Sequence, residues 1–161
     1  MKARTHTILF GTVVVAVLTV FSFAAGAQDK PAETMEIVRE KIRADKKLLI
    51  AENMQLTESE AKAFWPVYDG YQARLQKLTE HTLALIQDYG DHYLTMSDEA
   101  ARKLVGEYLA IQAERVKLMQ TFLPKFRQVL PEKKVMRYYQ LENKISAVVD
   151  YALAANIPLV K

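Results

Sequence analysis

The fold is decided by residues 56–93, which read LTESEAKAFWPVYDGYQARLQKLTEHTLALIQDYGDHY. Thr57 is followed three residues later by Glu60, the spacing of a capping box, in which each side chain bonds the other residue's backbone N–H at a helix start. From there apolar and aromatic residues recur every three or four positions, which places them on one face of an α-helix. The stretch therefore predicts a single helix of about 35 residues, about 50 Å long.

The repeating face of this helix is rich in aromatic rings. It comprises Ala61, Phe64, Trp65, Tyr68, Tyr71, Leu75, Leu78, Thr82, Leu85, Tyr89 and Tyr93. Pro66 falls inside the stretch and removes one backbone hydrogen bond, so we expect a kink there.

A shorter helix is predicted before this one, over Glu33 to Asn53. Four apolar residues share one of its faces at helical spacings: Met35, Val38, Ile42 and Leu49. The charged face opposite, with Arg39, Glu40, Lys41, Arg43, Lys46 and Lys47, is expected in solvent.

A third helix is predicted after Gly90 and residues 91–96, which interrupt the pattern and form the tip of a hairpin. Ser97 is its expected N-cap, and Pro124 is expected to bend or end it. Its apolar stripe comprises Ala101, Leu104, Tyr108, Ile111, Arg115, Leu118 or Met119, and Phe122.

A fourth helix is predicted from Pro131, a good first-turn residue, to Asn156 and Pro158. Its apolar side comprises Val135, Tyr138, Tyr139, Leu141, Ile145, Val148, Val149 and Ala152. The predicted fold class is therefore all-α, an elongated antiparallel helical hairpin with two shorter flanking helices. Because a thin hairpin has little depth for a core, we expect a homodimer.

The N-terminal segment predicts export. Lys2 and Arg4 precede an apolar run from Ile8 to Phe23, and small residues at 25–27 follow. This is the pattern of a secretory signal peptide, with cleavage expected between Ala27 and Gln28 and a single helical domain over 28–161 in the periplasm. The alternative is a retained anchor, since residues 8–27 are long enough to span a bilayer.

Composition excludes several classes of function. The chain has no cysteine, so disulfides, thiolate metal sites and thiol catalysis are excluded. Its net charge is only +3, and two of the cations lie in the predicted signal peptide, so nucleic-acid binding is not expected. No phosphate-binding glycine loop and no hydrolase motif occurs, so we expect neither a nucleotide cofactor nor an enzyme.

Two segments echo each other at an offset of 74 residues, LTESEAKAFW at 56–65 and LPEKKVMRYY at 130–139. Each has a leucine before a helix start, a glutamate, and two adjacent aromatic residues. One interpretation is local, a leucine that packs back on the helix it precedes. The other is a pair of related half-units that build one surface.

These leucine-led helix starts resemble the Spy/CpxP family of periplasmic stress proteins, whose motif LTxxQ occurs twice. The first copy here has Glu60 in place of Gln, and the second has Pro131 for Thr and Lys134 for Gln. The wider pattern, with Phe64, Trp65 and Pro66 in one half and residues 137–144 in the other, is similar to uncharacterised secreted bacterial proteins. The family resemblance implies a bent helical-hairpin dimer that binds unfolded clients without ATP or restrains an envelope stress sensor.

Six aromatic residues are the candidate binding residues for such clients: Phe64, Trp65, Tyr68, Tyr71, Tyr138 and Tyr139. Adjacent helical residues point about 100° apart, so a thin hairpin would leave some of these rings accessible. The competing interpretation is that they form a core and a dimer interface.

A weaker candidate is an acidic group near the hairpin tip: Asp88, Asp91, His92, Asp98 and Glu99. Such side chains bind cations, but their spacing matches no known loop, and acids at a helix start are also explained by the helix dipole. We therefore expect no metal. The expected function is a non-enzymatic protein that binds unfolded or envelope proteins, as an ATP-independent chaperone or stress adaptor. The alternatives are a structural envelope protein and a metal-responsive sensor.

Overall fold

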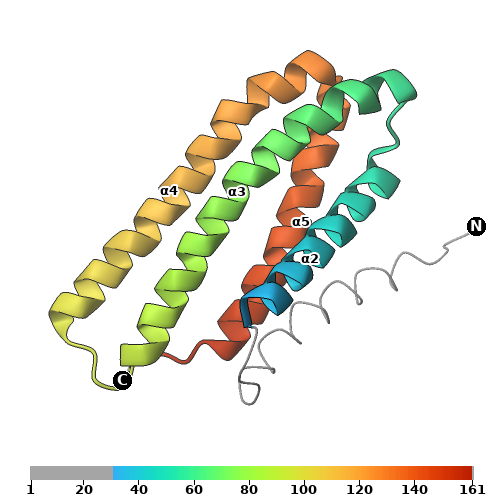
Figure 1. The fold of residues 1–161 in the computed structure, drawn as a ribbon. Helices are drawn as coiled ribbons and strands as arrows, with labels where there is room; N and C mark the ends of the chain where they lie inside the picture. Colours follow the sequence, from blue (N-terminus) through green and yellow to red (C-terminus); the bar gives the residue numbers. More distant parts are fainter. Residues whose placement is uncertain (1–30, 161) are drawn as a thin grey trace, which may run out of the picture. The chain divides into compact units, whose positions relative to one another are not determined.

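The computed structural model describes the backbone of residues 31–160 and the side chains of residue 41 and residues 43–160. This part of the chain contains four α-helices and no strand, which confirms the predicted all-α class (Figure 1). The helices are α2 (Pro31–Met54), α3 (Glu58–His92), α4 (Asp98–Val129) and α5 (Glu132–Asn156). The predicted signal peptide with its cleavage site at Ala27 and Gln28 lies outside the described residues, as do the side chains of Met35, Val38 and Ile42.

The chain divides into two compact units, which are described separately. One unit contains α2, to Gln55, and the part of α5 from Arg137 to Ala154. The other contains Leu56–Met136, which includes α3, α4 and the first turn of α5, together with the segment from Ala155. The prediction of one domain over 28–161 stays a prediction.

The start and length of α3 agree with the sequence pattern. The Thr57 hydroxyl accepts a hydrogen bond from the Glu60 backbone N–H at 3.3 Å, and the Thr57 N–H donates to Glu60 Oε2 at 2.8 Å. The capping box therefore forms, and the helix runs for 35 residues with Pro66 inside it.

Helix α4 runs antiparallel to α3 and forms a hairpin with it (Figure 1). Its N-cap is Ser97, whose hydroxyl accepts from the Ala100 N–H at 3.2 Å. The helix does not end at Pro124 but continues to Val129. Both helices curve near the end of the hairpin that holds the start of α3 and the end of α4 (Figure 1), the ends where Pro66 and Pro124 lie.

The core of the hairpin is a narrow row of side chains between the two helices. Its buried members are Phe64, Tyr68, Tyr71 and Leu78 on α3 and Leu104, Ile111, Leu118, Phe122 and Phe126 on α4. The buried stripe on α4 is narrower than predicted, because Tyr108 is exposed and Ala101 and Arg115 are only half-buried. Leu104, Ile111 and Leu118 recur every seven residues, which keeps one thin line of contact against α3.

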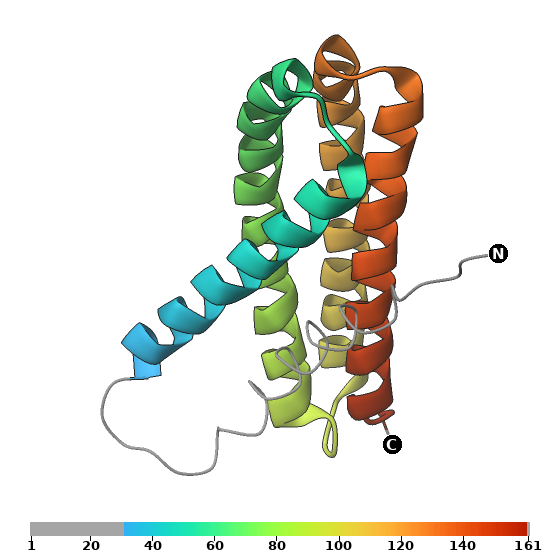
Figure 2. The same ribbon diagram turned by 90° about the vertical axis from the view of Figure 1, so that its right-hand side faces the viewer.

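In the other unit, α2 packs against the body of α5. Lys46 Nζ lies 2.9 Å from Glu142 Oε2, and Arg137 Nη1 donates to the Asn53 carbonyl at 3.4 Å. The order of these contacts makes the helices antiparallel, and α2 is inclined to α5 in Figure 2. Lys46, expected on a solvent-exposed face, is therefore largely buried in an ion pair, with 17% of its side chain exposed.

The two echoing segments have similar patterns of burial and of ring packing. Residues 56–65 and 130–139 have the same degree of burial at each position, except at the leucine and the sixth residue, which are more buried in the second copy. Adjacent rings meet edge to face in both copies, with centroids 5.0 Å apart for Phe64 and Trp65 and 5.7 Å apart for Tyr138 and Tyr139. The repeat is thus present in structure as well as in sequence.

Candidate protein-binding surface

Four of the six candidate aromatic residues lie in the core. Phe64 and Tyr138 are 0% exposed, Tyr68 is 1% exposed and Tyr71 is 3% exposed. A ring that is fully covered by the rest of its own chain cannot touch a client unless the fold opens. These residues therefore match the interpretation of the aromatic stripe as core, and the accessible surface expected from all six is smaller than predicted.

The buried rings on α3 form one aromatic cluster with two phenylalanines of α4. The Phe64 centroid lies 5.8 Å from Phe126, and the Tyr71 centroid lies 5.4 Å from Phe122 and 6.0 Å from Phe126. Aromatic pairs at these separations are attractive beyond the apolar area they bury. The cluster holds together the end of the hairpin where α3 begins and α4 ends.

Trp65 and Tyr139 are half-buried, so they remain the accessible members of the six. They occupy equivalent positions in the two sequence echoes, each next to a fully buried ring. Trp65 also packs edge to face against Tyr68 at 5.3 Å, which fixes its orientation. Two partly covered rings offer only a small contact area, so a larger apolar surface elsewhere becomes relevant.

That larger surface lies on α4 and was not among the predicted sites. Five apolar side chains are exposed along one side of the helix: Val105 (59%), Tyr108 (52%), Leu109 (59%), Val116 (53%) and Met119 (37%). We refer to them as the α4 strip. Their spacing of three, one, seven and three residues keeps them on one face. Exposed apolar side chains that line up in this way mark interaction surfaces more often than scattered ones do.

The position of the α4 strip follows from the line of contact with α3. Val105 and Met119 directly follow the buried residues Leu104 and Leu118, so they point about 100° away from the core. The apolar arc of α4 is therefore about twice as wide as its contact with α3. The signal was present in the sequence as apolar residues directly after two of the buried ones, Val105 after Leu104 and Met119 after Leu118.

Charged side chains elsewhere on the surface of α4 carry both signs. Lys103 lies 3.6 Å from both Asp88 of α3 and Glu107 of α4, and Arg102 and Lys117 are exposed. Mixed charge of this kind gives little electrostatic steering towards a polyanion. The contact surface is therefore defined by its apolar side chains.

Acidic side chains at the hairpin tip form hydrogen bonds and ion pairs with donors of the same chain. His92 Nδ1 lies 3.1 Å from Asp88 Oδ1 and 2.8 Å from the Asp88 carbonyl, and Lys103 approaches the other Asp88 oxygen. Asp91 accepts from Gln87 at 2.9 Å. The hydrogen bond to the Asp88 carbonyl, and then the negative charges of Asp88 and Asp91, raise the pKa of His92.

The remaining candidates for a metal, Asp98 and Glu99, lie in the first turn of α4, where their negative charges interact favourably with the helix dipole. Among the side chains that the structure describes, those of residue 41 and residues 43–160, no group of three or more histidine, cysteine, aspartate or glutamate side chains could hold a metal ion.

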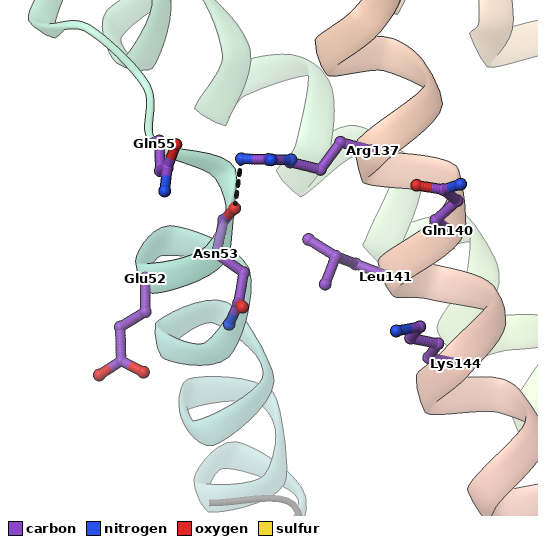
Figure 3. A pocket seen from close by; sticks show the side chains of 7 residues that line it. All are labelled: Glu52, Asn53, Gln55, Arg137, Gln140, Leu141 and Lys144. Atoms are coloured by element: carbon purple, nitrogen blue, oxygen red, sulfur yellow. Dashed lines mark hydrogen bonds between the residues drawn. The ribbon is translucent and has the colours of Figure 1, made fainter. Parts of the chain in front are cut away.

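A hollow of about 300 Å³ lies between the end of α2 and the face of α5 in the first unit (Figure 3). It is lined by Glu52, Asn53, Gln55, Arg137, Gln140, Leu141 and Lys144. The Arg137 guanidinium crosses it to the Asn53 carbonyl, one of the last carbonyls of α2, which have no partner within their own helix. This arrangement caps α2 and needs no ligand to account for it.

The chain matches no protein-family model, no curated protein and no solved structure. Between Pro31 and Val160, none of the helices combines the length and the apolar character that crossing a membrane would require.

Proposed function

We propose that this protein binds incompletely folded proteins in the periplasm without ATP, as a chaperone or envelope-stress adaptor, and that the α4 strip is its contact surface. The observation that carries the proposal is the row of exposed apolar side chains on a well-packed helix. The predicted export signal and the LTxxQ-like helix starts support the same interpretation. The partner is an extended, apolar-rich segment of another protein, which could lie along α4.

The size of the α4 strip favours weak and exchangeable binding. Burial of a whole aliphatic side chain contributes about 1.5–3 kcal/mol, so the four half-exposed ones offer roughly 3–6 kcal/mol in total. Association costs on the order of 4–15 kcal/mol in lost translational and rotational freedom. The strip alone therefore cannot hold a client tightly, which suits a holdase that releases its client without an energy source.

A structural envelope protein without clients is the second candidate. The burial of Phe64, Tyr68, Tyr71 and Tyr138 favours it, because these rings serve the core as that alternative requires. The two candidates differ in whether the α4 strip has a partner.

The test is suppression of aggregation by the exported protein, purified from the periplasm of cells that express the full chain. Light scattering follows a chemically unfolded client without nucleotide. The double variant Leu109→Gln/Val116→Gln should lose suppression, while Ala110→Gln/Glu114→Gln on the opposite side of α4 should keep it. Glutamine is a good helix former, so both variants retain their helicity, which circular dichroism verifies. Failure of the unaltered protein with several clients would reject the proposal and leave the structural role.

A further inference from the structure

Arg115 lies on α4 between the core of the hairpin and the α4 strip. It is half-buried, four residues after the buried Ile111 and four residues before the exposed Met119. Residues four apart are neighbours on a helix surface, so Arg115 adjoins both sets of side chains. An arginine in such a position packs its apolar stem against the protein and keeps its charged end at the edge of the surface.

The Arg115 guanidinium has no partner within the part of the chain that the structure describes. Its Nε–H is buried and donates to no acceptor there, and none of its other nitrogens takes part in a hydrogen bond or ion pair among the described residues. A buried donor without an acceptor costs free energy, and a charged donor costs more than a neutral one. Because the side chain is only half-buried, an acceptor from another molecule can reach the guanidinium and remove that cost.

The carboxylates of α4 lie away from this arginine. Between residues 101 and 123 they are Glu107 and Glu114, about 140° and 160° around the axis from Gln112, which is exposed between Leu109 and Val116 of the strip. Arg115 is three residues from Gln112 and thus only about 60° away. An acidic group that lies on the strip would therefore meet a cation and no carboxylate of this part of α4.

Arg115 is also the charged residue that falls within the length of the strip on this side of α4. The other two charged residues on this side are Arg102 and Asp98, 13 and 17 residues before it, about 20 and 25 Å along the axis. They carry opposite signs and lie before the first residue of the strip. The charge that complements the strip is therefore a single negative one, beside Arg115.

A protein segment fits this surface better than a lipid surface does. Helices that lie on membranes bury an apolar face and carry several lysines or arginines on the polar one. The α4 strip instead has an exposed amide, Gln112, among its apolar members and one arginine at its edge. A peptide backbone supplies donors and acceptors to an amide, and an acidic side chain supplies the carboxylate for Arg115.

We infer, on the basis of the proposed function, that the segments bound by the α4 strip are apolar stretches that carry an aspartate or glutamate, and that Arg115 binds this carboxylate. A guanidinium can donate two parallel hydrogen bonds to the two oxygens of a carboxylate, which lysine cannot do. Arg115 thereby selects acidic apolar segments and disfavours segments whose apolar residues are bordered by lysine or arginine.

The length of the strip sets the length of the segment. Val105 to Met119 spans 14 residues, about 21 Å, which corresponds to about six residues of an extended chain. Arg115 lies about 6 Å before Met119 along the axis. The carboxylate should therefore lie within such a six-residue apolar stretch, near one of its ends.

The experiment measures the binding of fluorescein-labelled peptides to the exported protein by fluorescence polarisation. The peptides are about 12 residues of valine, leucine and serine, with glutamate, glutamine or lysine at the centre, so that the central residue reaches Arg115 in either chain direction. The unaltered protein should bind the glutamate peptide about tenfold more tightly than the glutamine peptide, and the lysine peptide least tightly.

Variants assign this preference to one side chain. Arg115→Gln should bind the glutamate and glutamine peptides equally, and Arg115→Lys should keep a preference of only a few-fold, because its ammonium cannot form the paired hydrogen bonds. Lys117→Gln is the matched control: it removes an exposed cation from the other side of α4 and should keep the full preference. Circular dichroism verifies the helicity of each variant.

Each contrary result has a distinct meaning. Equal binding of the glutamate and glutamine peptides by the unaltered protein, or an equal loss of preference in Lys117→Gln and Arg115→Gln, would overturn the role of Arg115. Binding to phosphatidylglycerol vesicles that is lost in Arg115→Gln would assign the arginine to lipid and also overturn it. Binding of none of the peptides, or binding that survives Leu109→Gln/Val116→Gln, would instead reject the strip as the contact surface, and the proposed function with it.

Discussion

Replacing Gly70 by alanine should stabilise the hairpin. Gly70 lies within α3 and is exposed. A Cβ built on it would lie 3.7 Å from Cε1 of Phe122 on α4. This is an ordinary van der Waals separation, so alanine fits without displacing the ring. Glycine in a helix interior costs about 0.8–1 kcal/mol relative to alanine. The partly buried methyl adds a few tenths of the roughly 0.8 kcal/mol per buried CH₂, so the expected gain is about 1–1.5 kcal/mol.

Gly106→Ala is the matched control, because a Cβ there meets nothing within 4 Å. It should gain only the helix-propensity contribution of about 0.8–1 kcal/mol. Urea unfolding followed by Trp65 fluorescence measures both variants, since Trp65 is the only tryptophan and lies in the same compact unit as both glycines. With a slope of about 1–3 kcal/mol per molar urea, the midpoint should rise by roughly 0.3–1.5 M.

The result that would refute the packing of Phe122 against α3 is a loss of stability in Gly70→Ala together with a gain in Gly106→Ala. That combination would mean that the ring lies closer to the α3 backbone than described. A stabilisation by Gly70→Ala that is clearly smaller than that by Gly106→Ala would also indicate that the ring lies closer to the α3 backbone.

The other predictions concern the core and two ion pairs. Phe64→Ala should lower the free energy of unfolding by about 3–5 kcal/mol and Phe64→Leu by much less, measured by the same urea titration; equal small losses would show that this ring is not core. Asp88 raises the pKa of His92, so their contact stabilises the fold fully below the unfolded pKa of about 6.5 and loses its effect as pH rises through the folded pKa. The loss of melting temperature in His92→Gln should therefore be larger at acidic than at alkaline pH. The hydrogen bond from Lys134, and then that from the Thr57 N–H, lower the pKa of Glu60, so its contribution is present above the unfolded pKa and is lost as pH falls through the folded one. The deficit of Glu60→Gln at neutral pH should therefore shrink in acid, and a constant deficit would assign it to the neutral capping contact instead.

Local chemistry made the helices predictable. The Thr57 capping box and the Ser97 cap each satisfy backbone donors within a few residues, so the starts of α3 and α4 follow from sequence alone. The end of α4 does not follow from Pro124, because a proline breaks only one hydrogen bond, and the packing of Phe126 beyond it keeps the helix going to Val129.

Exposure was harder to predict than helicity. Apolar residues cover about half the circumference of α4, and periodicity alone does not say which part of that arc meets α3. Tyr108 and Leu118 both belong to the predicted apolar stripe, yet Tyr108 is 52% exposed and Leu118 is 8% exposed. The choice depends on the rotation of α4 about its own axis, a tertiary property that is set by Phe122 and Phe126 against the rings of α3.

The ion pair between Glu60 and Lys134 has a consequence for the origin of the repeat. These residues hold the same position in the two echoes, 74 residues apart, and their side chains bond each other. In a symmetric pair of half-length chains, this position would face its own copy, and two glutamates or two lysines would repel. One polypeptide that carries two different copies can place opposite charges here, which a pair of identical chains cannot. A tandem duplication of either half would therefore place like charges at this contact and should be less stable than the present chain.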